Sequence, residues 1–270
     1  MRFVTFNVNG IRARLHQLAS VTEKLQPDVL ALQEIKVSDE QFPLESVQAL
    51  GYPHVSYYGQ KGHYGVALLS KTAPVAAQLG FPWRPADQQR RFQSVDYRFG
   101  DSPLRIINGY FPQGDSRTHP TKFPAKQQFY ADIERYLNEH CDSDAPVILA
   151  GDMNVAPADA DVGIGEDNAK RWLRTGKASF LPEEREWLDR LFAWGMVDGY
   201  AARPTEERLF SWFDYRSRAF EQEPKRGLRI DLILTSQILN GRLQGTDIDY
   251  RIRGEEKPSD HCPVWCDFLL

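Results

Sequence analysis

The stretch VILAGDMN, residues 147–154, shows the pattern from which the fold of this chain is predicted. Four apolar residues run directly into Gly151, and Asp152 and Asn154 follow. A short apolar run bounded by a turn signal is typical of a strand buried on both faces. The acidic and amide side chains therefore stand at the end of a buried strand, where packing does not require them.

Short apolar runs of the same kind recur along the whole chain and alternate with amphipathic segments. Besides 147–150, the predicted strands are 3–8, 29–32, 66–70, 104–110, 230–235 and 264–268. Apolar spacing of three and four residues predicts helices over 15–25, 129–137 and 182–194, the last ending at Gly195. Hairpin-length and crossover-length gaps both occur, so we expect mixed sheets covered by helices.

Composition places the chain among ordinary globular proteins. Of its 270 residues, 41% are apolar and 26% are charged, which fits a single domain spanning residues 1–270. The apolar runs are strand-sized, so no membrane-spanning helix is expected. The first residues lack a long apolar stretch, and the cysteines are sparse and odd in number, so we expect a cytoplasmic protein.

The net charge and the cysteine spacing argue against a protein that coats polyanions and against a disulfide near the C-terminus. The net charge of −4 argues against a protein that coats polyanions generically. Cys262 and Cys266 lie on one predicted strand, about 13 Å apart, which is too far for a disulfide, so we expect small buried thiols.

Several other predicted strands also end in, or contain, a polar residue without an obvious packing role. Such residues are usually turn formers, and each alone is weak support for a functional site. Asp231 is more informative, because a carboxylate inside an apolar strand is costly to bury without a partner. Arg229 is the nearest candidate partner in sequence, but it lies only two residues away on the same strand face, so His261 is the more interesting candidate.

Taken together, these residue types predict a metal-assisted phosphodiester site. Mg²⁺ prefers oxygen ligands and takes one or two carboxylates plus phosphate oxygens, and Glu34 and Asp260 can supply the carboxylates. Asparagines can orient a water, and a histidine paired with an aspartate can stabilise charge on a phosphoryl group. The motifs GxSxG and GxxxxGK[ST] are missing from the sequence, and the cysteines are too few for a thiolate zinc site.

Four blocks carry a resemblance to a known family: FNVNGIRAR at 6–14, LALQEIKV at 30–37, LAGDMNVAP at 149–157 and KPSDHCPVW at 257–265. With further blocks between them, in the same order, the sequence resembles the bacterial DNA-repair members of the endonuclease/exonuclease/phosphatase superfamily. The resemblance implies an α/β fold of DNase I type, a four-layered sandwich with two mixed sheets packed face to face and helices outside. Ile35, where relatives often carry a hydroxyl residue, is a departure outside the assigned site.

The resemblance also implies roles for individual side chains. Catalytic roles are implied for Asp152, His261, Asn154, Tyr110, Asp231 and Asn7. Asp152 would position and deprotonate the attacking water, and His261, paired with Asp231, would contact the phosphate. Glu34 would bind Mg²⁺, or Mn²⁺ in its place, with Asp260 and Asn9 beside it.

The implied substrate is double-stranded DNA with abasic sites or 3′ ends. Incision 5′ to an abasic site would leave a 3′-hydroxyl, and the same site would give 3′→5′ exonuclease and 3′-phosphatase activity. Trp212, Leu228 and Ile230 match the walls of a pocket for the abasic sugar, although core packing is the plain alternative for them. Contacts to the DNA backbone are expected from Gln113, Arg91, Lys170, Arg171, Arg174, Lys177 and Arg216.

Two alternatives keep part of this interpretation. The same fold could act as a phosphatase or phosphodiesterase on inositol lipids, sphingomyelin or RNA, although the basic segments and the Trp212 region favour DNA. A non-catalytic DNA-binding module would be expected to lose Glu34, Asp152 or His261, and all three are present. We expect a monomer, with the acidic runs at 159–167 and 183–186 facing away from the DNA.

Overall fold

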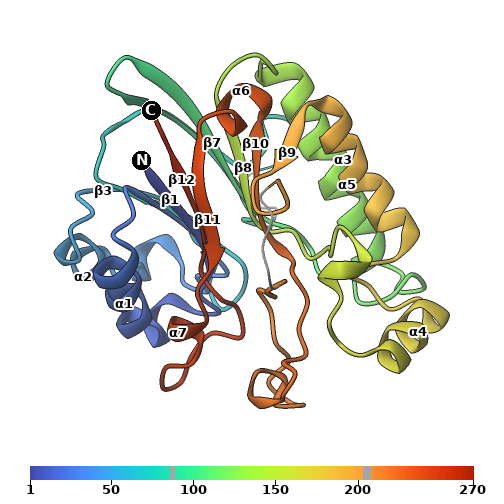
Figure 1. Ribbon diagram of the computed structural model, residues 1–270. Helices are drawn as coiled ribbons and strands as arrows, with labels where there is room; N and C mark the ends of the chain where they lie inside the picture. Colours follow the sequence, from blue (N-terminus) through green and yellow to red (C-terminus); the bar gives the residue numbers. More distant parts are fainter. Residues whose placement is uncertain (86–88, 203–207) are drawn as a thin grey trace.

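A computed structural model describes residues 1–85, 89–202 and 208–270, and it contains two six-stranded sheets (Figure 1). The first sheet has the order β11 (Leu243–Ile248), β12 (Val264–Phe268), β1 (Arg2–Asn7), β2 (Val29–Gln33), β4 (Val66–Ser70) and β3 (His54–Tyr58). The second has the order β5 (Pro74–Leu79), β6 (Phe92–Phe99), β7 (Ser102–Tyr110), β8 (Val147–Asp152), β10 (Asp231–Ser236) and β9 (Met196–Asp198).

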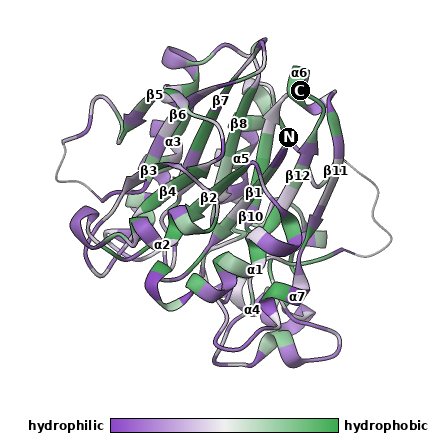
Figure 2. Cartoon of the chain, turned by 90° about the vertical axis from the view of Figure 1, so that its left-hand side faces the viewer, coloured by the Kyte–Doolittle hydropathy of each residue, from purple (hydrophilic) through white to green (hydrophobic). Residues whose placement is uncertain are grey.

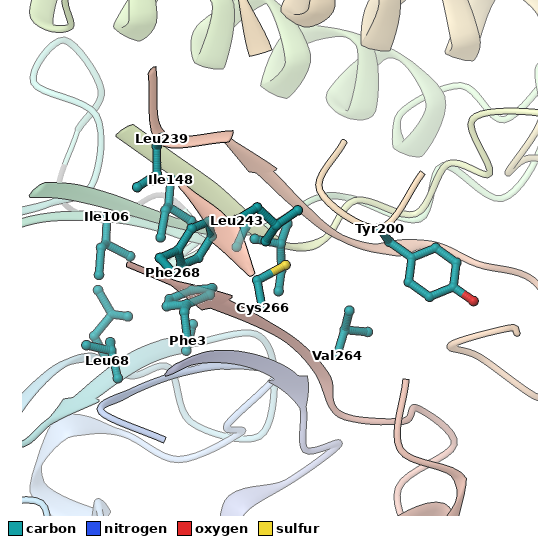
Figure 3. Packing of buried hydrophobic residues seen from close by; sticks show 14 of the residues in the cluster. Phe3, Leu68, Ile106, Ile148, Tyr200, Leu239, Leu243, Val264, Cys266 and Phe268 are labelled. Carbon is teal, nitrogen blue, oxygen red and sulfur yellow. The ribbon is translucent and has the colours of Figure 1, made fainter. Parts of the chain in front are cut away.

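Each sheet has one parallel pair near its centre, β1 with β2 and β7 with β8, and its other pairs are antiparallel. The sheets pack face to face over a core that includes Phe3, Leu68, Ile106 and Ile148 (Figure 3). Figure 2 shows that the strands inside this sandwich are mostly hydrophobic, whereas the loops around it are mostly hydrophilic. The mixed sheets expected from the sequence are therefore confirmed.

Helices cover the two outer faces and complete four layers (Figure 1). The first sheet carries α1 (Leu15–Leu25), α2 (Leu44–Ala49) and α7 (Tyr250–Arg253), and the second carries α3 (Lys122–His140) and α5 (Pro182–Trp194). α4 (Glu166–Thr175) stands apart at one end, and α6 (Gln237–Asn240) follows β10. Four 3₁₀ turns complete the described elements: Ile11–Ala13, Asp39–Gln41, Asp159–Asp161 and Ala219–Glu221. The predicted four-layered sandwich is thus confirmed.

The strongly apolar elements agree with the sequence prediction, whereas the four edge strands, the inner strand β6 and several helices were not predicted. The bounds of β4, β12 and α1 match the prediction, and α5 ends before Gly195, whose φ is 120°. The sequence did not predict β3, β5, β6, β9, β11 or α4. The six residues of β5 are all exposed at the edge of the sheet, so this strand carries no core-facing apolar pattern. α4 has no fully buried residue, although its Ala169 and Trp172 are partly buried against the apolar cluster of Leu228 and Ile230.

Buried ion pairs join segments that are distant in the sequence. Asp161 and Glu184, which belong to the two acidic runs, are fully buried. The guanidinium of Arg229 lies 2.8 Å from Asp161 and 2.7 Å from Asp198. Asp231 pairs with His261, as expected from the sequence.

Cys262 and Cys266 are buried, as expected from the sequence, and Cys141 is partly exposed. Within the described parts of the chain, none of the helices combines the length and the apolar character needed to cross a bilayer.

Candidate active site

The strand arrangement brings polar strand ends to one edge of the sandwich. The carboxyl ends of β1 and β2 pair at Asn7 and Gln33, and those of β7 and β8 pair at Tyr110 and Asp152. β10 is antiparallel to β8 and starts at the same edge, with Asp231 opposite Asp152. Because β1 also contacts β8 across the sandwich, side chains from both sheets converge there.

A cavity of about 370 Å³ opens at this edge and is lined by most of the predicted site residues. The predicted residues in its lining are Glu34, Tyr110, Gln113, Asp152, Asn154, Lys177, Trp212, Arg216, Leu228, Ile230, Asp260 and His261. Asn7, Asn9 and Asp231 do not line it but hydrogen-bond to residues that do. Lys170, Arg171, Arg174 and Arg91 are not among the lining residues.

His261 and Asp231 form a buried pair facing Asp152. His261 Nδ1 lies 2.8 Å from Asp231 Oδ2, and its Nε2 lies 3.8 Å from Asp152 Oδ2. Burial alone lowers the pKa of His261, but Asp231 and Asp152 outweigh that effect and raise it to about 10. The imidazole is therefore held as a cation beside Asp152 at neutral pH.

Asp152 is oriented by two hydrogen bonds. Asn7 donates from Nδ2 to Asp152 Oδ2 over 2.9 Å, and the backbone N–H of Asn154 donates to Oδ1 over 3.0 Å. Burial raises the pKa of Asp152 to about 7, with Asp231 adding to the shift while His261 and Asn7 oppose it. A carboxylate with a pKa near neutrality suits a general base, because such a group can both accept and release a proton.

Three site residues adopt a backbone conformation that is unusual for non-glycine residues. Asn9, Glu34 and Asn154 have φ values of 44°, 57° and 53°, and each closely follows the end of a strand. Residues held in this left-handed region are strained and are found preferentially at functional sites. At each of these residues the chain turns sharply away from the strand, so that the side chain lies at the edge of the sandwich where the strands end.

Glu34, Asn9 and Asp260 form an oxygen-rich group at one side of the cavity. Asn9 Nδ2 donates to Asp260 Oδ1 over 2.9 Å, and Trp212 Nε1 donates to Asp260 Oδ2 over 3.0 Å. Lys36 Nζ lies 3.0 Å from Glu34 Oε1 and 2.5 Å from Asn9 Oδ1. An ammonium group thus already bridges two of these oxygens, which indicates that they favour a cation.

A second group of possible ligands lies deeper in the site. Asp152, Asp231 and His261 offer ligand atoms that all lie within 4.8 Å of one another. The histidine nitrogen that faces Asp231 is already hydrogen-bonded to that carboxylate. The oxygen atoms of Glu34, Asn9 and Asp260 therefore suit a hard divalent cation better than the group of Asp152, Asp231 and His261 does.

Tyr110 projects into the cavity and is supported from behind by Arg91. The Arg91 guanidinium lies 4.5 Å from the Tyr110 ring centroid and donates to the Tyr110 carbonyl over 3.0 Å. Burial raises the pKa of Tyr110 well above its usual range, and Glu34 and Asp152 add to the shift. Arg91 is itself 7% exposed, so it lies beneath Tyr110 rather than on an open surface.

Trp212, Leu228 and Ile230 belong both to the apolar core and to the wall of the cavity. Leu228 and Ile230 are buried in a small apolar cluster with Ile164 and Phe180, and Trp212 packs against it. Leu228, Ile230 and Trp212 also line the cavity. The cluster is therefore core on one side and cavity wall on the other.

The basic residues of the 170–177 segment differ in their relation to the cavity. Lys170 pairs with Glu166 within α4, Arg171 donates to Asn168, and Arg174 is exposed near the end of the helix. Lys177 reaches the cavity, where its ammonium lies 3.7 Å from the Trp172 ring centroid. The α4 surface is solvated, as isolated charge runs usually are, yet it adjoins the cavity through Trp172.

Sequence reasoning missed four residues at this edge: Lys36, Ser179, Ser211 and Asp214. Trp172, whose place inside the basic run 170–177 is visible in the sequence, also lines the cavity. Ser211 carried no usable signal, yet its buried hydroxyl accepts hydrogen bonds from the backbone N–H groups of Ile230 and Asp231 at 3.0 and 2.9 Å.

The model of the endonuclease/exonuclease/phosphatase family matches residues 4–261. The chain belongs to this family. Its resemblance to the family's DNA-repair members also holds in pairwise comparison. It is 54% identical to exodeoxyribonuclease III of Haemophilus influenzae over 269 residues, covering 99% of this chain and 100% of the relative.

Solved structures within the family show the same architecture over the full length of both chains. A 3′ phosphatase from Neisseria bound to a product DNA hairpin superposes with a TM-score of 0.89 at 33% identity. An AP endonuclease from Archaeoglobus fulgidus gives 0.89 at 31% identity. Both comparisons cover 100% of each chain, so this chain shares its whole fold with both proteins.

Proposed function

We propose that this chain is a metal-dependent DNA-repair nuclease that hydrolyses the phosphodiester 5′ to abasic sites in duplex DNA. The same site would remove 3′-terminal nucleotides and 3′ phosphates. The observation that carries the proposal is the cavity in which Asp152, His261 and Glu34 lie beside the apolar wall of Leu228 and Ile230. Relatives named as exodeoxyribonuclease III, AP endonuclease and 3′ phosphatase support it.

Glu34 would hold the divalent cation, with Asp260 and Asn9 beside it. The donor set fits, because carboxylate and amide oxygens are the ligands that Mg²⁺ prefers, and Mn²⁺ takes similar ligands. When bound, the cation would neutralise charge on the phosphoryl oxygens. We propose Mg²⁺ as the ion that this group of oxygen atoms binds, with Mn²⁺ as a possible substitute.

The protein groups would act in one in-line displacement. Asp152 would orient a water molecule and accept its proton as the water oxygen attacks phosphorus. The bond from phosphorus to the 3′ oxygen breaks, the phosphate stays on the 5′ side of the abasic sugar, and the leaving 3′ oxygen takes a proton from solvent water to become the 3′-hydroxyl. His261, as a cation held by Asp231, would stabilise the charged phosphoryl group, and Tyr110 would approach the phosphate or the leaving oxygen.

Selectivity for abasic sites would come from the cavity wall. An abasic sugar can leave the helix without the cost of unpairing a base, and Trp212, Leu228 and Ile230 offer it an apolar wall. A second function, hydrolysis of inositol lipids, sphingomyelin or RNA, would use the same catalytic groups. The relatives that act on DNA make it the weaker candidate.

A duplex with one tetrahydrofuran abasic analogue tests the proposal, because β-elimination lyases cannot cut this analogue. We expect cleavage 5′ to the analogue with Mg²⁺ and loss of cleavage in EDTA, with recovery when Mg²⁺ is returned. Folded protein that leaves the duplex intact under all metal conditions would contradict the proposal. RNA and phosphoinositides would then be the next substrates to test.

The rate of cleavage is expected to depend on pH through Asp152. Its pKa of about 7 means that the carboxyl is protonated, and inactive as a base, at lower pH. With Mg²⁺ saturating, kcat/KM should therefore rise about tenfold per pH unit below that value and level off above it. The residual activity of Asp152→Asn should lack this acid limb, and an unchanged limb in that variant would assign it to another group.

Duplex affinity is expected to fall steeply with salt. If about four cationic side chains neutralise phosphates, raising salt from about 50 to about 200 mM should weaken binding by about 100-fold. Lys177→Ala and Arg216→Ala should each reduce the slope of log K against log salt by about one. Measured in an Asp152→Asn background, Lys71→Ala is the control, because Lys71 follows the end of β4 remote from the cavity. Salt-independent affinity would contradict the phosphate contacts.

Residues 1–270 would act as one catalytic domain and as a monomer, which light scattering with and without duplex DNA can check. A cytoplasmic location is proposed because the chain has only three cysteines, a sparse and odd number that fits a reducing compartment.

A further inference from the structure

Lys126 is a buried lysine that the proposed reaction does not use. It lies in the first turns of α3 and is 0% exposed. Its ammonium donates to the backbone carbonyls of Asn154 over 2.8 Å and Gln113 over 3.3 Å, and to Glu184 Oε1 over 2.5 Å. An ammonium has three protons to donate, and each has a partner here.

Glu184 completes the arrangement from the neighbouring helix. It is also 0% exposed, and its second carboxylate oxygen accepts the backbone N–H of Leu181 at the start of α5 over 2.8 Å. Burial lowers the pKa of Lys126, and Glu184 opposes that shift. A buried ion pair of this kind contributes little net stability relative to apolar side chains of the same size. We therefore ask which parts of the chain the pair holds in place.

The two carbonyls that Lys126 binds belong to loops that shape the cavity. Asn154 follows Asp152 after β8 and has the strained φ of 53°, whereas Gln113 follows Tyr110 after β7. Next to Gln113, Gly114 has a φ of 89°, and a Cβ added there would lie 3.0 Å from Lys126 Cδ. The loop therefore packs directly on the lysine side chain.

A second side chain of α3 reaches the same loop. The buried Tyr130 hydroxyl donates to the carbonyl of Met153, between Asp152 and Asn154, over 2.8 Å. Along the single helix α3, two polar groups thus bind consecutive carbonyls of the segment that carries the proposed general base. Hydrophobic packing alone would hold the helix against the sheet but would not select these carbonyls.

We propose that Lys126, held by Glu184, is a positioning residue that fixes the Asp152–Asn154 turn and the Gln113 loop in the geometry needed for cleavage. The inference rests on the proposed function for its catalytic consequence. Displacement of a reacting group by about 1 Å can cost about 100-fold in rate. Loss of the lysine should therefore lower kcat, while the binding surface for duplex DNA stays largely in place.

The double variant Lys126→Met/Glu184→Gln removes both charges together, so neither is left buried alone. Glutamine keeps an oxygen for the Leu181 N–H. We expect a folded protein whose kcat on the tetrahydrofuran duplex is lower by about 10- to 100-fold, with KM changed by less than about threefold. The backbone amide signals of Gly114 and Asn154 in ¹⁵N-labelled protein should shift or broaden.

A matched control exists on the same helix. Asp132 of α3 forms a largely buried pair with Arg84, 2.7 Å apart, and neither residue lines the cavity. Arg84→Met/Asp132→Asn should leave kcat and both amide signals as in the wild type. A wild-type kcat in the folded Lys126→Met/Glu184→Gln protein would overturn the proposal, and so would an equal loss in the control.

A measurement on the wild-type protein keeps the proposal testable if the double variant does not fold. The Lys126 ammonium should exchange its protons much more slowly than exposed lysines and should show hydrogen-bond couplings to the carbonyls of Asn154 and Gln113. Fast exchange without these couplings would overturn the inference. Failure of the wild-type protein to cleave DNA would instead count against the proposed function, since the ammonium measurement does not depend on activity.

Discussion

Asp152→Asn is expected to lower the rate of cleavage 5′ to a tetrahydrofuran abasic analogue by at least ~100-fold with Mg²⁺ present. A positioned general base contributes about 10²- to 10⁴-fold, and an amide in place of the carboxylate cannot accept the proton of the attacking water. The substitution preserves size, and its oxygen can still accept one of the hydrogen bonds that Asn7 and the N–H of Asn154 make to the carboxylate. Single-turnover cleavage under saturating enzyme measures the chemical step without DNA affinity.

Asp101→Asn is the matched control, because Asp101 is exposed in the turn between β6 and β7. It should cleave at the wild-type rate. Asp152→Asn should also keep its thermal unfolding midpoint or raise it, because the buried carboxyl, whose pKa burial raises, is replaced by a neutral group. An Asp152→Asn enzyme within about tenfold of the wild type would remove Asp152 from the role of general base.

Arg229→Met is expected to lower the free energy of unfolding by about 3–5 kcal/mol. Arg229 is 1% exposed, and its guanidinium pairs with Asp161 and Asp198, which are also buried. Methionine fills much of the space but leaves both carboxylates without their cation, and uncompensated buried charge is the main cost. Urea unfolding followed by tryptophan fluorescence measures the change.

Arg135→Met supplies the control for this loss. Arg135 pairs with Glu139 on the exposed face of α3, and such pairs contribute less than about 1 kcal/mol. Adding Asp161→Asn and Asp198→Asn to Arg229→Met should restore part of the stability, because the stranded charges are then removed. If Arg229→Met alone lowers the free energy of unfolding by less than about 1 kcal/mol, Arg229, Asp161 and Asp198 do not form a stabilising ion-pair network.

The Arg229 network also illustrates how the cavity wall depends on distant residues. Leu228 and Ile230 face the cavity on either side of Arg229, whose side chain is anchored to a 3₁₀ turn through Asp161 and to β9 through Asp198. We therefore expect Arg229→Met to weaken abasic selectivity as well as stability. Comparing cleavage of abasic and base-paired duplexes by the folded variant checks this.

Local patterns explain why much of the fold could be predicted. Apolar runs such as 66–70 and 264–268 form strands wherever a sheet can bury them, and the spacing of Leu15, Leu18, Val21 and Leu25 predicts a helix in any compact fold. β5 escaped prediction because its side chains remain exposed, so burial imposed no period on its sequence. α4 escaped prediction although it is amphipathic, because the apolar side chains that it packs against the cavity wall, Ala169 and Trp172, stand within a mostly charged segment. The four layers came from family resemblance, since strand order depends on contacts between distant segments.

The chemical character of the site was likewise determined by the sequence. Carboxylates, amides and one histidine stand at strand ends or inside a strand, and the parallel pairs β1–β2 and β7–β8 carry such ends to one edge. Residue types and their place along a strand are local properties, so Glu34, Asp152 and His261 could be predicted as site residues from the sequence.

The pairing of Asp231 with His261 was expected from the sequence, but only the tertiary structure decided how the other buried charges pair. Arg229 binds Asp161 and Asp198, which are distant from it in the sequence. Lys126 likewise meets carbonyls and a carboxylate that are remote in sequence. The physical reason is that a buried charge needs a partner within hydrogen-bond distance, and the packing of the two sheets and their helices determines which partner lies that close.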